Sequence, residues 1–143
     1  MTAFSGDFDP SPMIEGKIID AAVVSFGIVH EKTADPSIVQ YPAADEWVFP
    51  LWRAEYARST ADVTAGKTVM DCRKLRAGQQ LTLIASGVIA KQAYFVLDSN
   101  GRVKAATTNA TPIATRVIGR AHEASAADGD QFLGEIVLGE VTI

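Results

Sequence analysis

Short runs of β-branched and aromatic residues recur along the chain, and turn residues separate them at intervals of about ten residues. No stretch has the apolar periodicity of a long amphipathic helix, and no repeat of twenty to fifty residues is apparent. The pattern predicts an all-β protein built as a compact β-barrel or β-sandwich. The expected strands lie within residues 17–30, 68–72, 81–85, 94–97, 102–105, 116–122 and 132–143.

Two turns stand out in the second half of the chain. Asn100-Gly101 lies between an apolar run and an alternating run, and Asn-Gly favours a tight hairpin because both residues tolerate positive φ. Asp128-Gly129-Asp130 resembles part of a calcium loop, but the other acidic ligands of such a loop are missing. We therefore expect a hairpin at the first position and a plain tight turn at the second.

The first fifteen residues differ from the rest in composition. Gly6, Pro10 and Pro12 oppose both a helix and a central strand, which predicts an extended N-terminal arm over residues 1–15. A disordered terminus is the alternative. Residues 16–143 are predicted to form a single β-rich domain, because a chain of 143 residues suits one domain. The arm also carries four apolar residues that we expect to contact a neighbouring subunit: Phe4, Phe8, Met13 and Ile14.

Residues 46–58 hold both tryptophans of the chain. Their first half alternates as on a strand, Pro50 opposes a helix through the middle, and the second half permits a helical turn. Burial in the core is the ordinary role of such an aromatic cluster. Anchoring at an interface is the alternative, because Trp and Tyr are enriched there. On the second interpretation three residues contact a partner: Trp47, Trp52 and Tyr56.

The charge and the single cysteine exclude several classes of protein. The net charge is −4, and the only basic cluster is the short one at residues 73–76, so we expect no nucleic-acid partner. Cys72 cannot form an internal disulfide and, because it lies in the predicted strand 69–72, is predicted to be a small buried residue rather than a nucleophile. No apolar run approaches the roughly eighteen residues of a membrane helix, and no signal peptide is visible, so no membrane partner is expected.

The chain lacks a recognisable catalytic or metal-binding motif. His30 and His122 are far apart in sequence, and no Cys-x-x-Cys or His-x-x-x-His spacing exists. Gly66-Lys67-Thr68 lacks the earlier glycine of a phosphate-binding loop, and there is no Gly-x-Ser-x-Gly motif. We therefore expect no enzyme activity, no metal and no cofactor, and a protein that works by binding.

Residues 78–143 resemble the capsid cement, or head decoration, proteins of tailed bacteriophages. The resemblance consists of an ordered series of pieces: a strand-turn-strand hairpin, an Ile-Gly-x-Ala motif, an Ala-x-Gly-Asp turn and a final aliphatic strand. The segments that carry it run from Tyr94 to Ala105, from Val117 to Ala124, from Ala127 to Asp130 and from Glu135 to Leu138.

The resemblance implies a β-barrel or "β-tulip" module that forms a homotrimer on the outside of an expanded icosahedral shell. Such a protein is made in the host cytoplasm, joins the virion exterior and holds neighbouring copies of the major capsid protein together, with no catalysis and no cofactor. One alternative is a carbohydrate-binding jelly roll of the adhesin type, in which Trp47, Trp52 and Tyr56 form a stacking platform. Another is a small trimeric nucleotide hydrolase, whose phosphate motif and catalytic aspartate are not found.

Overall fold

The computed structural model describes residues 13–143 and confirms the all-β barrel prediction. Over these residues the fold consists of strands and one short helix. The first half contains β1 (Ile14–Ile19), β2 (Ile28–Glu31), β3 (Ile38–Gln40), β4 (Leu51–Ala54), α1 (Thr60–Thr64) and β5 (Val69–Lys74). The second half contains β6 (Gln80–Ser86), β7 (Tyr94–Leu97), β8 (Val103–Ala105), β9 (Ala114–Ala121) and β10 (Asp128–Thr142).

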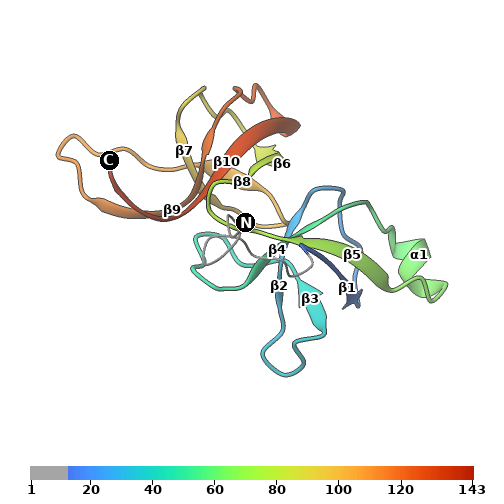
Figure 1. The fold of residues 1–143 in the computed structure, drawn as a ribbon. Coiled ribbons are helices and arrows are strands. Elements are labelled where there is room, and N and C mark those ends of the chain that lie inside the picture. The colour runs from blue at the N-terminus through green and yellow to red at the C-terminus, as the bar shows by residue number, and fades with distance from the viewer. Residues whose placement is uncertain (1–12) are drawn as a thin grey trace, which may run out of the picture.

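The strands form two closed barrels, which lie side by side in Figure 1. The first barrel has the strand order β1-β3-β2-β4-β5, and the second has the order β6-β8-β7-β9-β10. In each barrel the first strand runs parallel to the third and antiparallel to the fifth. The remaining neighbours are antiparallel in both. The two barrels therefore have the same topology.

The irregular connections between the strands also correspond in the two barrels. In the first barrel an isolated bridge joins Val23 to Arg58, and in the second an isolated bridge joins Ile89 to Ser125. Each bridge has two backbone hydrogen bonds of 2.9–3.0 Å. In each barrel the bridge joins a residue between the first and second strands to a residue just after the fourth strand. The connection before β2 is thus a structural counterpart of the connection before β7.

A strained backbone position is repeated in these connections. Phe26 has φ 65° and Gln92 has φ 72°, although neither is a glycine. The N–H of Phe26 donates to the carbonyl of Ala54 at 2.8 Å, and the N–H of Gln92 donates to the carbonyl of Ala121 at 2.7 Å. Shared topology, bridges and backbone strain together show that the second barrel is a structural copy of the first.

In both barrel cores a large side chain faces a small one across the second and fourth strands, but the large and small residues have exchanged strands. In the first barrel Val29 lies opposite Trp52, and in the second Phe95 lies opposite Gly119. Val29, Trp52 and Phe95 are all buried. A Cβ on Gly119 would come within 2.4 Å of Cζ of Phe95, so the glycine makes room for the ring. One barrel places its large residue on the second strand and the other on the fourth, with close packing in both.

The barrels are joined through the outer face of β2 and β4. Arg53, only 6% exposed, donates from its guanidinium to the carbonyl of Thr82 on β6 at 3.1 Å. The N–H of Ile28 donates to the carbonyl of Gly101 at 2.9 Å. Three first-barrel residues, Ile28, Leu51 and Leu75, belong to the apolar cluster that forms the core of the second barrel. The two barrels therefore share buried surface.

The hairpin predicted at Asn100-Gly101 is confirmed. β7 pairs antiparallel with β8, and Asn100 and Gly101 have φ values of 61° and 74°. The plain turn predicted at Asp128-Gly129-Asp130 is wrong, because these residues begin β10, with a register shift between Asp128 and Gln131. A carboxylate oxygen of Asp130 accepts the N–H groups of Ala126 and Ala127, each at 3.0 Å, and so fixes the chain just before the strand.

Two local predictions in the first half are wrong. Residues 47–49 were expected to alternate on a strand, but β4 begins only after Pro50. The helical turn that the second half of residues 46–58 permits does not form there, and α1 begins at Thr60. α1 starts with a reciprocal capping box, in which the Ser59 side chain accepts the N–H of Asp62 and the Asp62 carboxylate accepts the N–H of Ser59.

The start of β1 lies inside the predicted arm. Ile14 pairs with Arg73 and Glu15 with Cys72, so the last two residues of the arm belong to the first barrel. The carbonyl of Met13 accepts the N–H of Lys74 at 2.8 Å. The rest of the predicted arm, including Phe4 and Phe8, lies outside the described residues.

Candidate contact surfaces

β9 and β10 extend beyond the second barrel as a two-stranded ribbon. β10 pairs with β6 only from Asp128 to Glu135, and β9 pairs with β7 only through Gly119 and Arg120. Beyond these points residues 114–117 and 139–142 pair with each other, and the structure over residues 13–143 has no further strand on either outer edge. The ribbon extends to the left in Figure 1 and carries the C-terminus.

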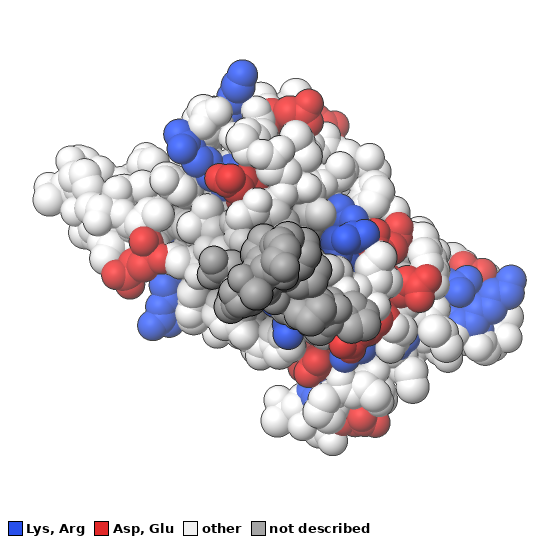
Figure 2. All heavy atoms as spheres, in the orientation of Figure 1, with Lys and Arg blue, Asp and Glu red and all other residues white. Residues whose placement is uncertain are grey.

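The outer end of the ribbon is uncharged. Residues 105–115 contain no Lys, Arg, Asp or Glu, and the outermost part at the left of Figure 2 is accordingly white. Ile113 is 55% exposed, and it exchanges backbone hydrogen bonds with Ile143 at 2.9 and 3.0 Å. Natural proteins usually protect open strand edges with charged residues. A ribbon with two open edges and no charged side chain at its outer end is suited to contact with another protein.

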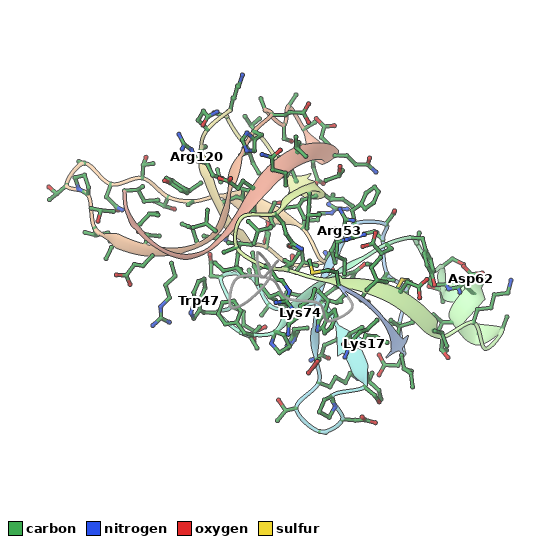
Figure 3. The ribbon with its side chains drawn as sticks, in the orientation of Figure 1. Lys17, Trp47, Arg53, Asp62, Lys74 and Arg120 are labelled. Atoms are coloured by element: carbon green, nitrogen blue, oxygen red, sulfur yellow. The ribbon has the colours of Figure 1, made fainter. Side chains whose placement is uncertain are left out.

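A groove of about 480 Å³ lies where β9 separates from β7. Trp47 lies on its first-barrel side (Figure 3), with the guanidinium of Arg116 5.6 Å from its ring and Phe49 edge-on at 4.8 Å. Phe49 is 46% exposed. The other side is formed by β7, β8, β9 and the loop between β8 and β9. The lining residues include Val96, Lys104, Asn109, Ile113, Thr115 and Ile118.

Polar contacts fix the loop that carries Trp47. The N–H of Asp45 donates to the carbonyl of Leu97 at 2.9 Å, and its carboxylate pairs with Lys104 at 3.0 Å. The carboxylate of Glu46 accepts the N–H of Ala43 at 3.0 Å. The loop is thus tied both to itself and to β7 and β8 of the second barrel, which places Trp47 beside the groove.

The two tryptophans belong to different parts of the protein. Trp47 is half-buried beside the groove, whereas Trp52 is 3% exposed and lies in the core of the first barrel. The ammonium groups of Lys17 and Lys74 lie 4.4 and 5.9 Å from the Trp52 ring. The structure therefore does not bring the tryptophans together as one stacking platform, and the Trp52 ring is not at the surface.

Tyr56 completes the edge of β5. Its hydroxyl accepts the N–H of Asp71 at 3.2 Å and lies 3.5 Å from the carbonyl of Val69. It does so where β4 has already ended, so the hydroxyl takes the place of a strand partner. Tyr56 thus has a structural role that the sequence did not indicate.

A second exposed apolar area lies on β1 and β5. Ile14 is 43% exposed, Ile18 is 44% exposed, and Val69, opposite Ile18, is 57% exposed. Of the residues predicted to contact a partner, Ile14 is the one that belongs to this area. Its contact with a partner stays a prediction, as do those of Trp47 and Met13.

The described residues offer no metal site, and their cysteine is buried. No group of three or more His, Cys, Asp or Glu side chains within residues 13–143 is placed to hold a metal ion. Cys72 is fully buried, and burial raises the pKa of its thiol to about 12. Over the same residues no helix is long and apolar enough to cross a membrane.

The buried thiol should be unreactive in the native protein. Because thiol reagents attack the thiolate, and because Cys72 is both buried and neutral at ordinary pH, labelling should require unfolding. We expect a soluble disulfide reagent at pH 8 to label the folded protein about 100-fold more slowly than the protein in urea. Equal rates in the two samples would contradict this placement of the cysteine.

The fold is similar to that of a solved phage protein. The crystal structure of the head fiber gp8.5 N base of bacteriophage phi29 matches with a TM-score of 0.64 and 11% sequence identity. The match covers 90% of this chain and 96% of that chain, so it includes both barrels. No protein-family model and no curated protein sequence matches the chain. At this identity the likeness shows a common fold.

Proposed function

We propose that this chain is a non-enzymatic structural protein of a tailed phage that binds the outer surface of the capsid. It acts as a homotrimer and stabilises the expanded shell by bridging neighbouring copies of the major capsid protein. The observation that carries the proposal is the fold shared with a phage head-fiber base over 90% of this chain. The resemblance of residues 78–143 to capsid cement proteins points to the same class.

The ribbon provides the surface that meets the shell. Its open edges can accept a strand or loop of a neighbouring protein through backbone hydrogen bonds. Residues 105–115 at its outer end expose Ile113 and carry no charged side chain, so this segment can be buried without desolvating one. Each contact of this size contributes only a modest binding free energy. Three linked copies bind more tightly, because the second and third contacts form at high effective concentration.

The remaining properties agree with a virion protein of this kind. The net charge of −4 disfavours binding to nucleic acid, so the shell protein and further copies of the chain are the expected partners. The protein would be made in the host cytoplasm and found on the capsid exterior. Residues 1–15, which precede or begin β1, would add contacts to a neighbouring subunit, as the sequence predicts.

Changing Ile113 to aspartate tests the ribbon as the shell contact. The substitution places a charge at the uncharged end without disturbing a buried side chain, because Ile113 is 55% exposed. Purified wild-type protein should coat expanded phage heads in cryo-electron micrographs. Ile113→Asp should bind at least about tenfold more weakly, because burial of the new carboxylate is costly.

Val88→Asp is the matched control, because Val88 is 71% exposed and lies in the connection between β6 and β7, outside the ribbon. It should coat heads as the wild type does. Heads that stay bare with wild-type protein would overturn the proposed function. Undiminished coating by Ile113→Asp would instead move the contact away from the ribbon.

A further inference from the structure

Each outer edge of the ribbon exposes unpaired backbone groups. Ile113 and Ile143 exchange two backbone hydrogen bonds, and bonded and non-bonded positions alternate along an antiparallel pair. The backbone groups that point away from the ribbon are therefore those of Ala114 and Arg116 on β9 and of Glu140 and Thr142 on β10. No strand within residues 13–143 pairs with these four residues on their outer side. Each edge can therefore accept a further strand.

The ribbon has one apolar and one charged face. Side chains alternate between the faces along each strand, and residues opposite each other share a face. One face carries Ile113, Thr115, Val117, Gly139, Val141 and Ile143. Val117 is fully buried, but the members of this set nearer the tip remain partly or largely exposed. One copy thus leaves part of an apolar sheet face in contact with water.

The charged face separates the two signs of charge. It carries Arg116 at the β9 edge and Glu140 at the β10 edge, and residues 114–117 and 139–142 contain no other charged side chain. The two residues are opposite each other in the register. The guanidinium of Arg116, however, lies over the Trp47 ring, and within residues 13–143 neither residue forms an ion pair. Pairing of two like edges would bring like charges together, whereas pairing of a β9 edge with the β10 edge of another copy brings opposite charges together.

The groove leaves room for a strand beside β9. Thr115 and Arg116 both line it, so it lies along the outer edge of β9. Residues 45–47 line the same groove toward its inner end, where Ile118 is buried, but Ala114 and Arg116 remain exposed. Paired strands lie about 4.8 Å apart. The part of the edge beyond Ile118 is therefore open to the β10 edge of a second copy.

We propose that three copies of this chain pair their ribbons edge to edge, with β9 of one copy beside β10 of the next, in a six-stranded antiparallel barrel. The inference rests on the homotrimer of the proposed function and names its interface. Head-to-tail contacts of this kind close into a ring, which leaves no open ribbon edge on any copy. Six strands are close to the five with which each barrel of one copy closes. The apolar faces turn inward, the charged faces turn outward, and the tips with Ile113 stay free at the mouth to meet the shell.

Charge reversal tests the edge pairing. Arg116→Glu and Glu140→Arg should each raise the dissociation constant of the trimer at least about tenfold, because like charges then meet at every contact between copies. The double variant Arg116→Glu/Glu140→Arg should restore the trimer, because the reversed edges are again complementary. Native mass spectrometry of the free protein gives the mass of each species, and circular dichroism shows that each variant is folded.

Arg120→Glu is the matched control. Arg120 is also an exposed arginine of β9, lies opposite a glutamate of β10, Glu135, and has its guanidinium 5.7 Å from an aromatic ring, that of Tyr94. It differs from Arg116 because β7 and β6 already pair with the two strands at these residues. Arg120→Glu should therefore form trimers as the wild type does.

Hydrogen exchange distinguishes strand pairing from a contact of charges alone. The outward amides of Arg116 and Glu140 should exchange at least about tenfold more slowly in the wild-type trimer than the same two positions do in the monomeric single variants. Amide-resolved nuclear magnetic resonance measures these rates.

The outcomes separate this inference from the proposed function. Trimers in the wild type and the double variant, with monomers in both single variants, support the inference. A folded double variant that stays monomeric overturns it, as do rapidly exchanging outward amides in a wild-type trimer, or a wild-type chain that is monomeric both in solution and on expanded heads. Coating of heads is scored separately. Coating without the trimer would refute the ribbon barrel, whereas bare heads beside a wild-type trimer in solution would refute the shell binding alone.

Discussion

Replacing Gly119 with alanine should lower the free energy of unfolding by about 3 kcal/mol, and the second barrel should be the part that fails. The new Cβ would lie 2.3 Å from the carbonyl oxygen of Glu135 and 2.4 Å from Cζ of Phe95. The carbonyl belongs to β10, opposite β9, so it cannot move without distorting the barrel. The Phe95 ring is fully buried and packs edge-on against Phe132 at 5.5 Å, so it has no free space to enter.

Urea unfolding measures the free energy of unfolding of Gly119→Ala, and Gly16→Ala is the control. Gly16 also lies in a strand, but the nearest heavy atom to a Cβ there is Cγ1 of Val69 at 3.7 Å. Gly16→Ala should therefore stay within about 0.5 kcal/mol of the wild type. If Gly119→Ala proved as stable as Gly16→Ala, the reversed packing of the two cores would be wrong.

Replacing each tryptophan with alanine should lower the free energy of unfolding by very different amounts. Trp52→Ala should lower the free energy of unfolding by about 3–5 kcal/mol, because it empties the core of the first barrel. It also removes the ring over which Lys17 and Lys74 are placed. Trp47→Ala should cost about 1 kcal/mol, because Trp47 is only half-buried at the groove.

Urea unfolding followed by circular dichroism measures both variants without relying on tryptophan fluorescence. Trp47→Ala should keep the folded spectrum and serves as the matched control for loss of an indole. Equal losses of stability would place both tryptophans in the same kind of environment and contradict the structure.

Local chemistry predicted the second half of the chain well. The hairpin at Asn100-Gly101 depends on two adjacent residues that tolerate positive φ, and β7 and β8 carry the expected patterns on either side. Features of this kind are readable from sequence because the residues that cause them are neighbours in the chain.

The duplication was not visible in the sequence, and the cores explain why. Equivalent core positions in the two barrels keep their burial but not their side chains: Val29 corresponds to Phe95, and Trp52 corresponds to Gly119. A change of size at one position is compensated across the strand pair, so the volume is conserved while the identities are not. A comparison of amino-acid identities cannot detect such a repeat, whereas a comparison of β-bridges and backbone dihedral angles can.

The contact surfaces were only partly predictable. Trp47 was expected at an interface, and it lies beside the groove, but the groove itself joins residues distant in sequence, such as Trp47 and Arg116. The uncharged end of the ribbon could have been predicted from the sequence, because residues 105–115 contain no charged side chain. The same holds for α1, whose capping residues Ser59 and Asp62 have the spacing of a helix start.

The length of β10 has a mechanical consequence. Its fifteen residues run from the far side of the second barrel to the tip of the ribbon, with register shifts between Asp128 and Gln131 and between Ile136 and Gly139. Tension applied at the tip along the strand would load the hydrogen bonds to β6 and β9 in parallel, so they resist together rather than opening one after another. The ribbon would then behave as a stiff tether that passes a pull on its end into the barrel as a whole.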